Sequence, residues 1–184
     1  MAKENTTRFI LLGFLSHEDM SGYDMKKRMD LSVSHFWNVG FGQIYPTLKE
    51  LSAEGLVQKK ECPPEKGPGK IVYSITAQGR EALLNWLRLP EEREYTRYEL
   101  LLKLFFSARL PVEYSLERIA AFQSRHERNL FLMEQFTQEL GSVLGSEPDH
   151  KYYYLTALFG KYVYQAYLAW AKEAQGMLGY PIEE

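Results

Sequence analysis

Residues 42–54 concentrate the side chains of this chain that are best suited to contacting a nucleic acid. On a helical wheel, Ile44, Leu48 and Leu51 share one face, which we expect to be buried. The opposite side carries Gln43, Pro46, Lys49, Glu50 and Ala53, three of them polar, with Tyr45 and Thr47 at its flanks. Amide, hydroxyl and ammonium groups displayed in this way suit base edges and phosphates in the DNA major groove. An ordinary solvent-facing helix has the same pattern, so the pattern alone leaves both interpretations open.

Pro46 indicates where this helix begins. A proline inside a helix loses a hydrogen bond and costs roughly 3 kcal/mol, whereas the first turn has no such bond to lose. We therefore expect the helix to start near Gly42, with Pro46 in its first turn, and to stop at Gly55. The free N–H groups of that turn, at the positive end of the helix dipole, can face a phosphate.

The rest of the first half supplies the elements that must position this helix. Apolar spacing and turn residues predict helices over 7–15 and 21–31, strands over 56–62 and 71–75, and a helix after Thr76. Leu83, Leu84 and Leu87 are expected to form the buried stripe of that last helix. The turn between the strands is basic and suits phosphates or a minor groove, with Lys59, Lys60, Lys66 and Lys70 around it.

The second half is predicted to be all helical, with helices over 98–108, 115–140 and 150–178. An acidic, proline-containing segment, residues 90–94 (PEERE), separates the halves and predicts domains over 1–90 and 95–184. The expected fold class is therefore mainly α with a small β wing. Residues 1–90 carry 12 Lys and Arg against 10 Asp and Glu, and residues 91–184 carry 10 against 14. Because the first half has only a small positive net charge, its electrostatic attraction for DNA is weak, and DNA binding would need a dimer and local focusing of charge.

Composition argues against an enzyme, a metalloprotein or a membrane protein. The 184 residues include one cysteine, Cys62, and four scattered histidines with no helical pair, so we expect no metal and no cofactor. Such lone histidines are expected at the surface. No uncharged stretch is apolar enough to cross a bilayer, and the apolar run 9–15 lacks the flanks of a signal peptide, so we expect a cytoplasmic protein.

Several segments together resemble one known family. They are residues 20–25 (MSGYDM), 36–37 (FW), 42–48 (GQIYPTL), 54–57 (EGLV), 73–76 (YSIT) and 99–106 (ELLLKLFF). These residues resemble the PadR family of bacterial transcriptional regulators, and the last segment resembles its larger subfamily, which has a long C-terminal helical domain. The likeness extends over nearly the whole chain.

The resemblance implies a winged helix-turn-helix domain, a helical dimerisation domain, and a homodimer on a pseudo-palindromic operator with half-sites roughly 10 bp apart or a multiple of that. Most members are repressors, some of them released by phenolic acids or other small aromatic effectors. The implied DNA-contacting residues are Ser21, Tyr23, Lys26, Gln43, Tyr45, Pro46, Thr47, Lys49, Lys66 and Lys70. Two alternatives stay open: an activator or ligand-independent regulator, and an aromatic-ligand or interaction module that no longer binds DNA.

Aromatic residues are dense near the C-terminus, with nine between residues 150 and 184. They form either a ligand pocket or a dimer core, and we favour the dimer core because aromatics are enriched at interfaces. The predicted dimerisation residues are Leu155, Phe159, Tyr162, Ala166 and Trp170. Trp37 and Phe41, just before the proline-containing helix, are candidates for contacting an effector, although a hydrophobic plug beneath that helix is the simpler interpretation.

Overall fold

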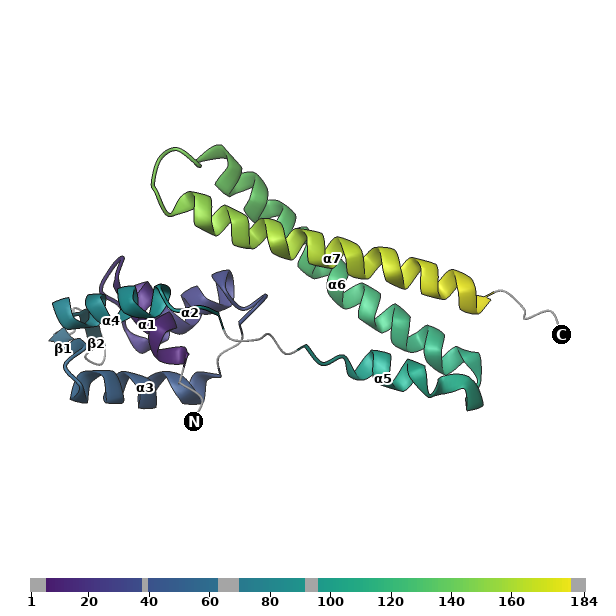
Figure 1. Ribbon diagram of the computed structural model, residues 1–184, viewed down its shortest axis with the longest axis horizontal. Helices are drawn as coiled ribbons and strands as arrows, with labels where there is room; N and C mark the ends of the chain where they lie inside the picture. Colours follow the sequence, from purple (N-terminus) through teal and green to yellow (C-terminus); the bar gives the residue numbers. More distant parts are fainter. Residues whose placement is uncertain (1–5, 38–39, 63–69, 92–95, 180–184) are drawn as a thin grey trace. The chain divides into compact units, whose positions relative to one another are not determined.

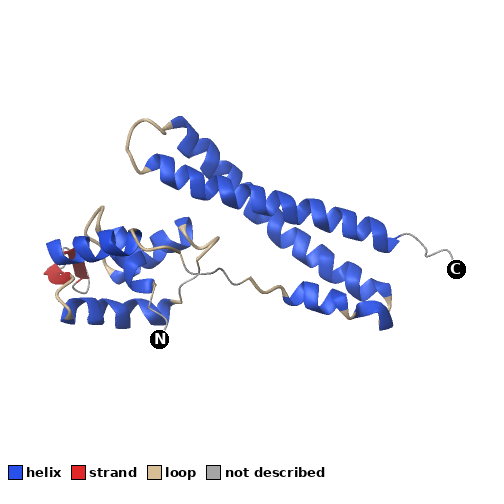
Figure 2. Cartoon of the chain, in the orientation of Figure 1, coloured by secondary structure: helices blue, strands red, loops and turns tan. Residues whose placement is uncertain are grey.

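The computed structural model describes residues 6–37, 40–62, 70–91 and 96–179 (Figures 1 and 2). Its elements are α1 (Thr7–Leu15), α2 (Gly22–Ser32), α3 (Phe41–Ala53), β1 (Val57–Cys62), β2 (Lys70–Ile75), α4 (Ala77–Leu87), α5 (Glu99–Phe105), the 3₁₀ turn η1 (Ser107–Arg109), α6 (Val112–Ser142) and α7 (His150–Gly179). The predicted fold class, mainly α with a small β wing, is confirmed. The chain divides into two compact units, residues 1–93 (unit 1) and 94–184 (unit 2).

Capping residues set the helix starts of unit 1. The Ser21 hydroxyl accepts a hydrogen bond from the Asp24 N–H (3.3 Å), and the Asp24 carboxylate accepts one from the Ser21 N–H (3.3 Å), which completes a capping box. The Thr76 hydroxyl accepts from the Gly79 N–H (3.0 Å) and donates to the Gly55 carbonyl (2.8 Å). Gly55 follows α3 with φ +72°, a conformation that favours glycine. The end of α3 is thereby tied to the start of α4.

The two strands of unit 1 form an antiparallel pair, with a register that runs from Val57 opposite Ile75 to Cys62 opposite Lys70. A further bridge joins Met20 to Tyr73, whose backbone N–H groups each donate to the other's carbonyl at 3.1 and 2.9 Å. The segment that leads into α2 is therefore hydrogen-bonded to β2, so the wing is fixed to the helical part of unit 1.

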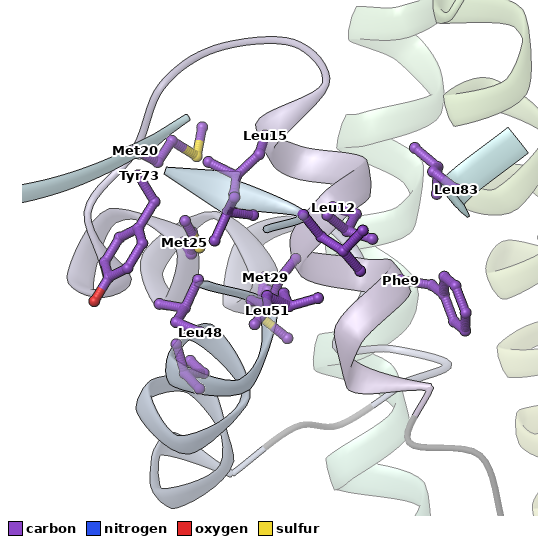
Figure 3. Close-up of a cluster of buried hydrophobic side chains, with 14 residues drawn as sticks. Phe9, Leu12, Leu15, Met20, Met25, Met29, Leu48, Leu51, Tyr73 and Leu83 are labelled. Carbon is purple, nitrogen blue, oxygen red and sulfur yellow. The ribbon is translucent and has the colours of Figure 1, made fainter. Parts of the chain in front are cut away.

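The core of unit 1 lies between α1, α2, α3 and the strands. Figure 3 shows side chains from these elements converging, among them Leu12, Met25, Met29, Leu48 and Leu51, each at most 2% exposed. Burial of such side chains supplies the main favourable term in folding.

Helix α4 packs by a different face from the predicted one. Leu83 is buried, whereas Leu84 and Leu87 are 51% and 62% exposed, so the predicted leucine stripe is wrong. The inward face instead carries Gly79, Leu83 and Trp86, and the Trp86 ring stacks on Phe9 with centroids 4.7 Å apart. The spacing of these three residues is also helical, and contact with α1 selects them.

In unit 2, α6 and α7 pack as a long hairpin, and α5 packs against α6 (Figure 1). The buried cluster consists of Ile119, Phe122 and Ala171. Helix α5 contributes no buried residue, and a hydrogen bond between the hydroxyls of Tyr98 and Tyr167 joins its start to α7. The helix predicted over 98–108 is shorter than expected, because η1 follows it and Pro111 precedes the start of α6.

Candidate nucleic-acid interface

The two faces of α3 differ sharply in exposure. Ile44, Leu48 and Leu51 are 0% exposed, which confirms the predicted buried face. Gln43 and Lys49 lie on the exposed side, and Tyr45 is 48% exposed. The helix therefore presents an amide, a phenol and an ammonium group to solvent while its apolar side is anchored in the core.

Thr47 does not lie where the wheel placed it. Its side chain is 2% exposed, so the prediction that it flanks the exposed face is wrong, while its contact with DNA stays a prediction. Thr47 follows Ile44 by three residues and precedes Leu51 by four, which places all three on one side of an α-helix. The contacts of α3 with α1 and α2 extend the buried side to include it.

Pro46 is inside the helix rather than in its first turn. Helix α3 begins at Phe41 after the N-cap Gly40, so Pro46 is its sixth residue. The start near Gly42 is confirmed to within one residue, but the reason given for it is wrong. At this position proline leaves the Gly42 carbonyl without its usual N–H donor. Both Gly42 and Pro46 are exposed, so water can solvate that carbonyl.

Gln43 and Tyr45 are partly held by neighbours. The Gln43 side-chain oxygen accepts a hydrogen bond from the Thr7 hydroxyl of α1 (3.4 Å). The Tyr45 ring is tilted against that of Phe41, with centroids 6.0 Å apart. These contacts limit the rotamers of the exposed face, which lowers the entropy lost when it meets a ligand.

Charge on the exposed side of α3 is nearly balanced. Lys49 and Glu50 are both exposed, and among the residues that the structure describes neither has an ion-pair partner. Glu54 forms an ion pair with Arg8 of α1. Lys49 is therefore available for a phosphate, while Glu50 repels one unless it accepts a hydrogen bond from a base such as cytosine.

The three residues at the start of α2 or within it that are predicted to contact DNA differ in exposure. Tyr23 is 65% exposed. Lys26 is half-buried and forms an ion pair with Asp30 one turn later. Ser21 is 6% exposed, and its hydroxyl donates to the Asp24 carboxylate at 2.8 Å, so its side chain is engaged within α2 and its contact with DNA stays a prediction.

Little of the predicted basic wing falls within the described residues. Lys59 and Lys60 are exposed on β1. Lys66 lies outside the described residues, and Lys70 begins β2 with a side chain that also lies outside them. The phosphate contacts of this turn therefore remain predictions.

Trp37 and Phe41 do not form a plug under α3. Their side chains are 41% and 46% exposed, so the simpler interpretation of these aromatics is wrong. A surface groove of about 390 Å³ lies beside α2, lined by residues that include Asp19, Asp24 and Leu31, and neither aromatic lines it. Both rings are accessible to a ligand from solvent.

The predicted dimerisation residues on α7 fall into two groups. Leu155, Phe159 and Tyr162 are 57%, 63% and 62% exposed, and Ala166 is exposed on the same face. Trp170 is half-buried and packs edge-to-face on Phe122 of α6, with centroids 5.6 Å apart. Trp170 therefore packs partly within its own protomer, and its contact with a second copy stays a prediction.

His126 was missed by sequence reasoning, which expected lone histidines at the surface. Its ring lies 4.2, 4.8 and 5.4 Å from the rings of Phe122, Tyr167 and Tyr164. Burial, and then the charge of Arg125, lower the pKa of His126. Burial also raises the pKa of Tyr167 to about 12, with a contribution from its hydrogen bond to Tyr98. The helical spacing between Phe122 and His126, one turn apart on one face, was the available signal.

The described residues hold no group of three or more His, Cys, Asp or Glu side chains placed to bind a metal ion. Within those ranges, none of the helices combines the length and the apolar character needed to cross a bilayer.

The arrangement of unit 1 is that of a winged helix-turn-helix protein, since α2 and α3 precede a two-stranded wing, and unit 2 adds a helical hairpin. Comparison with known proteins identifies the family. Residues 11–85 match the transcriptional regulator PadR-like family, and residues 96–179 match the virulence activator alpha C-term family. Residues 11–85 are therefore a PadR-like domain, and a long helical domain that matches the second family follows it.

One curated relative is the negative transcriptional regulator PadR of Bacillus subtilis (strain 168). It is 31% identical over 100 residues, which are 54% of this chain and 55% of that protein. The matched segment thus spans about half the length of that relative.

Solved structures show the same fold over more of the chain. Bacillus subtilis PadR in complex with operator DNA has a TM-score of 0.84 at 24% identity and covers 96% of this chain and 99% of that one. The same protein in complex with p-coumaric acid has a TM-score of 0.74 at 24% identity, covering 98% and 100%. The Vibrio cholerae virulence activator AphA has a TM-score of 0.67 at 28% identity, covering 93% and 96%.

Proposed function

We propose that this protein is a sequence-specific, DNA-binding transcriptional regulator that acts in the cytoplasm as a homodimeric repressor. The observation that carries the proposal is the two-sided character of α3. Fully buried Ile44, Leu48 and Leu51 hold the helix in unit 1, while Gln43 and Lys49 face solvent. A rigidly held helix with polar groups on its outer side suits the major groove.

The relatives support DNA as the partner and repression as the effect. The Bacillus subtilis protein of the same fold was crystallised with operator DNA, and its curated name is that of a negative regulator. An activator remains the alternative, since AphA shares the fold and is named a virulence activator. Transcription from a promoter that carries the selected site, measured with and without the protein, distinguishes repression from activation.

A homodimer is supported by the apolar surface of unit 2. Large side chains are exposed on α5 and at the residue after it: Leu102, Phe105 and Phe106 are 61%, 82% and 69% exposed. Phe159 and Tyr162 extend this apolar character to α7. Because exposed apolar surface on this scale marks an interaction site, a second copy of unit 2 is the partner that we propose.

The principal test is a DNA titration at two salt concentrations, with duplexes selected by the protein from a random-sequence library. Binding that engages phosphates weakens steeply as salt rises. Lys49→Ala should weaken binding and reduce the slope of log K against log salt by about one. Lys172→Ala, which removes an exposed lysine of α7, is the matched control and should bind like the wild type. A flat salt response, or no selected duplex, would leave only a ligand-binding or interaction module.

A small aromatic effector is a second part of the proposal. It is supported by the p-coumaric acid complex of the Bacillus subtilis protein and by the exposed rings of Trp37 and Phe41. Titration with p-coumaric acid, followed by tryptophan fluorescence and by release of the selected duplex, tests it. If Trp37→Ala folds, binds the duplex and still releases it normally with p-coumaric acid, Trp37 is not the residue that senses the effector.

A further inference from the structure

Gly22, the first residue of α2, is buried against the ring of Tyr45 from α3. A Cβ atom at Gly22 would lie 2.8 Å from Cε1 and 3.0 Å from Cζ of that ring. Carbon atoms that are not bonded prefer separations of about 3.5–4.0 Å. Among the described residues only Gly55 has a positive φ, so Gly22 is not needed for an unusual backbone conformation. What requires a glycine at this position is the space that the Tyr45 ring occupies.

Tyr45 also lies near the wing. Tyr73 of β2 is buried, and that burial, together with the nearby phenol of Tyr45, raises the pKa of Tyr73. The backbone of Tyr73 is hydrogen-bonded in both directions to Met20, two residues before Gly22. The entry to α2 therefore meets β2 through Met20 and meets α3 through the Tyr45 ring.

We infer that Tyr45 is a positioning residue. Its ring packs against Gly22 and sets the angle of α3 relative to the start of α2 and to Tyr73 of β2. This inference rests on the proposed DNA-binding function. The 13 residues of α3 extend about 20 Å, so a small tilt at Tyr45 displaces the side chains at the helix ends. Gln43 and Lys49 lie on either side of Tyr45, and both depend on that angle to meet DNA together.

Gly22→Ala tests this contact directly. The added methyl group meets the outer atoms of a side chain that can swing away, so the variant should unfold at nearly the wild-type temperature while the displaced ring frees α3 to tilt. Its affinity for the selected duplex should fall by about tenfold or more, with little change for random DNA of the same length. Gly13→Ala is the matched control, because a Cβ at Gly13 of α1 meets nothing within 4 Å. That variant should bind like the wild type.

A double-variant cycle separates positioning from direct DNA contact. Once Tyr45→Ala has removed the ring, adding Gly22→Ala should cost no further affinity, because the two variants disrupt one contact. Tyr45→Phe, which keeps the ring and removes the hydroxyl, should recover most of the affinity that Tyr45→Ala loses. These comparisons remain informative even if Gly22→Ala alone folds poorly.

Three results would overturn the inference while leaving the proposed function intact: Gly22→Ala binding like Gly13→Ala, additive losses in the double variant, or Tyr45→Phe binding no better than Tyr45→Ala. A wild-type chain that binds no duplex at all would instead overturn the proposed function, and this role of Tyr45 with it.

Discussion

The two units bury their apolar residues to very different extents. Unit 1 encloses a cluster of 14 buried apolar residues, whereas the α5–α6–α7 cluster of unit 2 has three. Phe105 and Phe159 of unit 2 remain 82% and 63% exposed. The core of unit 1 is complete within one protomer, so its stability should not depend on protein concentration. The apolar surface of unit 2 becomes buried only against another molecule, so its stability should rise with concentration.

The largest effect is expected from opening the core of unit 1. Leu48→Ala should lower the free energy of unfolding by about 2–5 kcal/mol, because it removes a fully buried side chain and leaves a cavity. Denaturant unfolding followed by Trp86 fluorescence measures this loss, which should be the same at low and high protein concentration. Lys49→Ala, at the next residue on the exposed side, is the control and should change stability by less than about 0.5 kcal/mol. The reverse order would mean that α3 is rotated.

Gly79→Ala should give the next largest loss. A Cβ there would lie 2.1 Å from the Leu56 carbonyl oxygen, which is backbone and cannot move aside as a side chain can. We expect about 1–3 kcal/mol of destabilisation, again independent of concentration. Gly13→Ala serves as the control and should be neutral or slightly stabilising, because alanine favours helices. A neutral Gly79→Ala would show that α4 can shift away from Leu56, and that the core of unit 1 is not rigid at this point.

Phe159→Asp should act on unit 2 only through association. A charge in the proposed dimer surface should weaken self-association at least tenfold, which is about 1.4 kcal/mol, without unfolding the protomer. Sedimentation at several concentrations measures the change, and Lys172→Asp on the same helix is the control. If the wild-type chain sediments as a monomer at every concentration, the apolar surface of unit 2 is not a dimer interface, and the stability of unit 2 should not rise with concentration.

The smallest effect is expected from acidification. The pKa of folded His126 lies below its ordinary value, so the unfolded chain binds the proton more readily. The stability that this gives is fully present above the ordinary pKa of about 6.5 and is lost as pH falls toward the lower folded value. Melting of unit 2, followed by Trp170 fluorescence between pH 7.5 and 5, should show a small decline that His126→Phe removes. A matching decline in that variant would assign the pH dependence to other groups.

Much of unit 1 was predictable, because its local signals agree with its packing. Ser21, Thr76 and Gly55 mark element ends through hydrogen bonds or backbone geometry that depend on one residue type. The buried face of α3 follows from three apolar residues at helical spacing. The same helical wheel predicted that Gln43 and Lys49 are exposed, and they are.

The errors arose where packing against another element decides the outcome. Thr47 and Leu84 lie at the margins of helix faces, and a neighbouring helix buried one and left the other exposed. Pro46 suggested the first turn of a helix. It is tolerated inside α3 because it is exposed, so water can hydrogen-bond to the unpaired Gly42 carbonyl. His126 packs against Phe122 of its own helix and against Tyr167 of α7, which is distant in sequence. Spacing within α6 indicates the first of these contacts, but spacing within one helix cannot predict contacts with another element.

Helix α5 buries none of its residues and is joined to α7 through the hydroxyls of Tyr98 and Tyr167. In an isolated protomer its amide protons should therefore be among the first in unit 2 to exchange with deuterium, because little must open to expose them. Pairing of two chains over this helix would slow that exchange. The deuterium uptake of residues 99–105 should consequently report the degree of assembly, at concentrations too low for sedimentation.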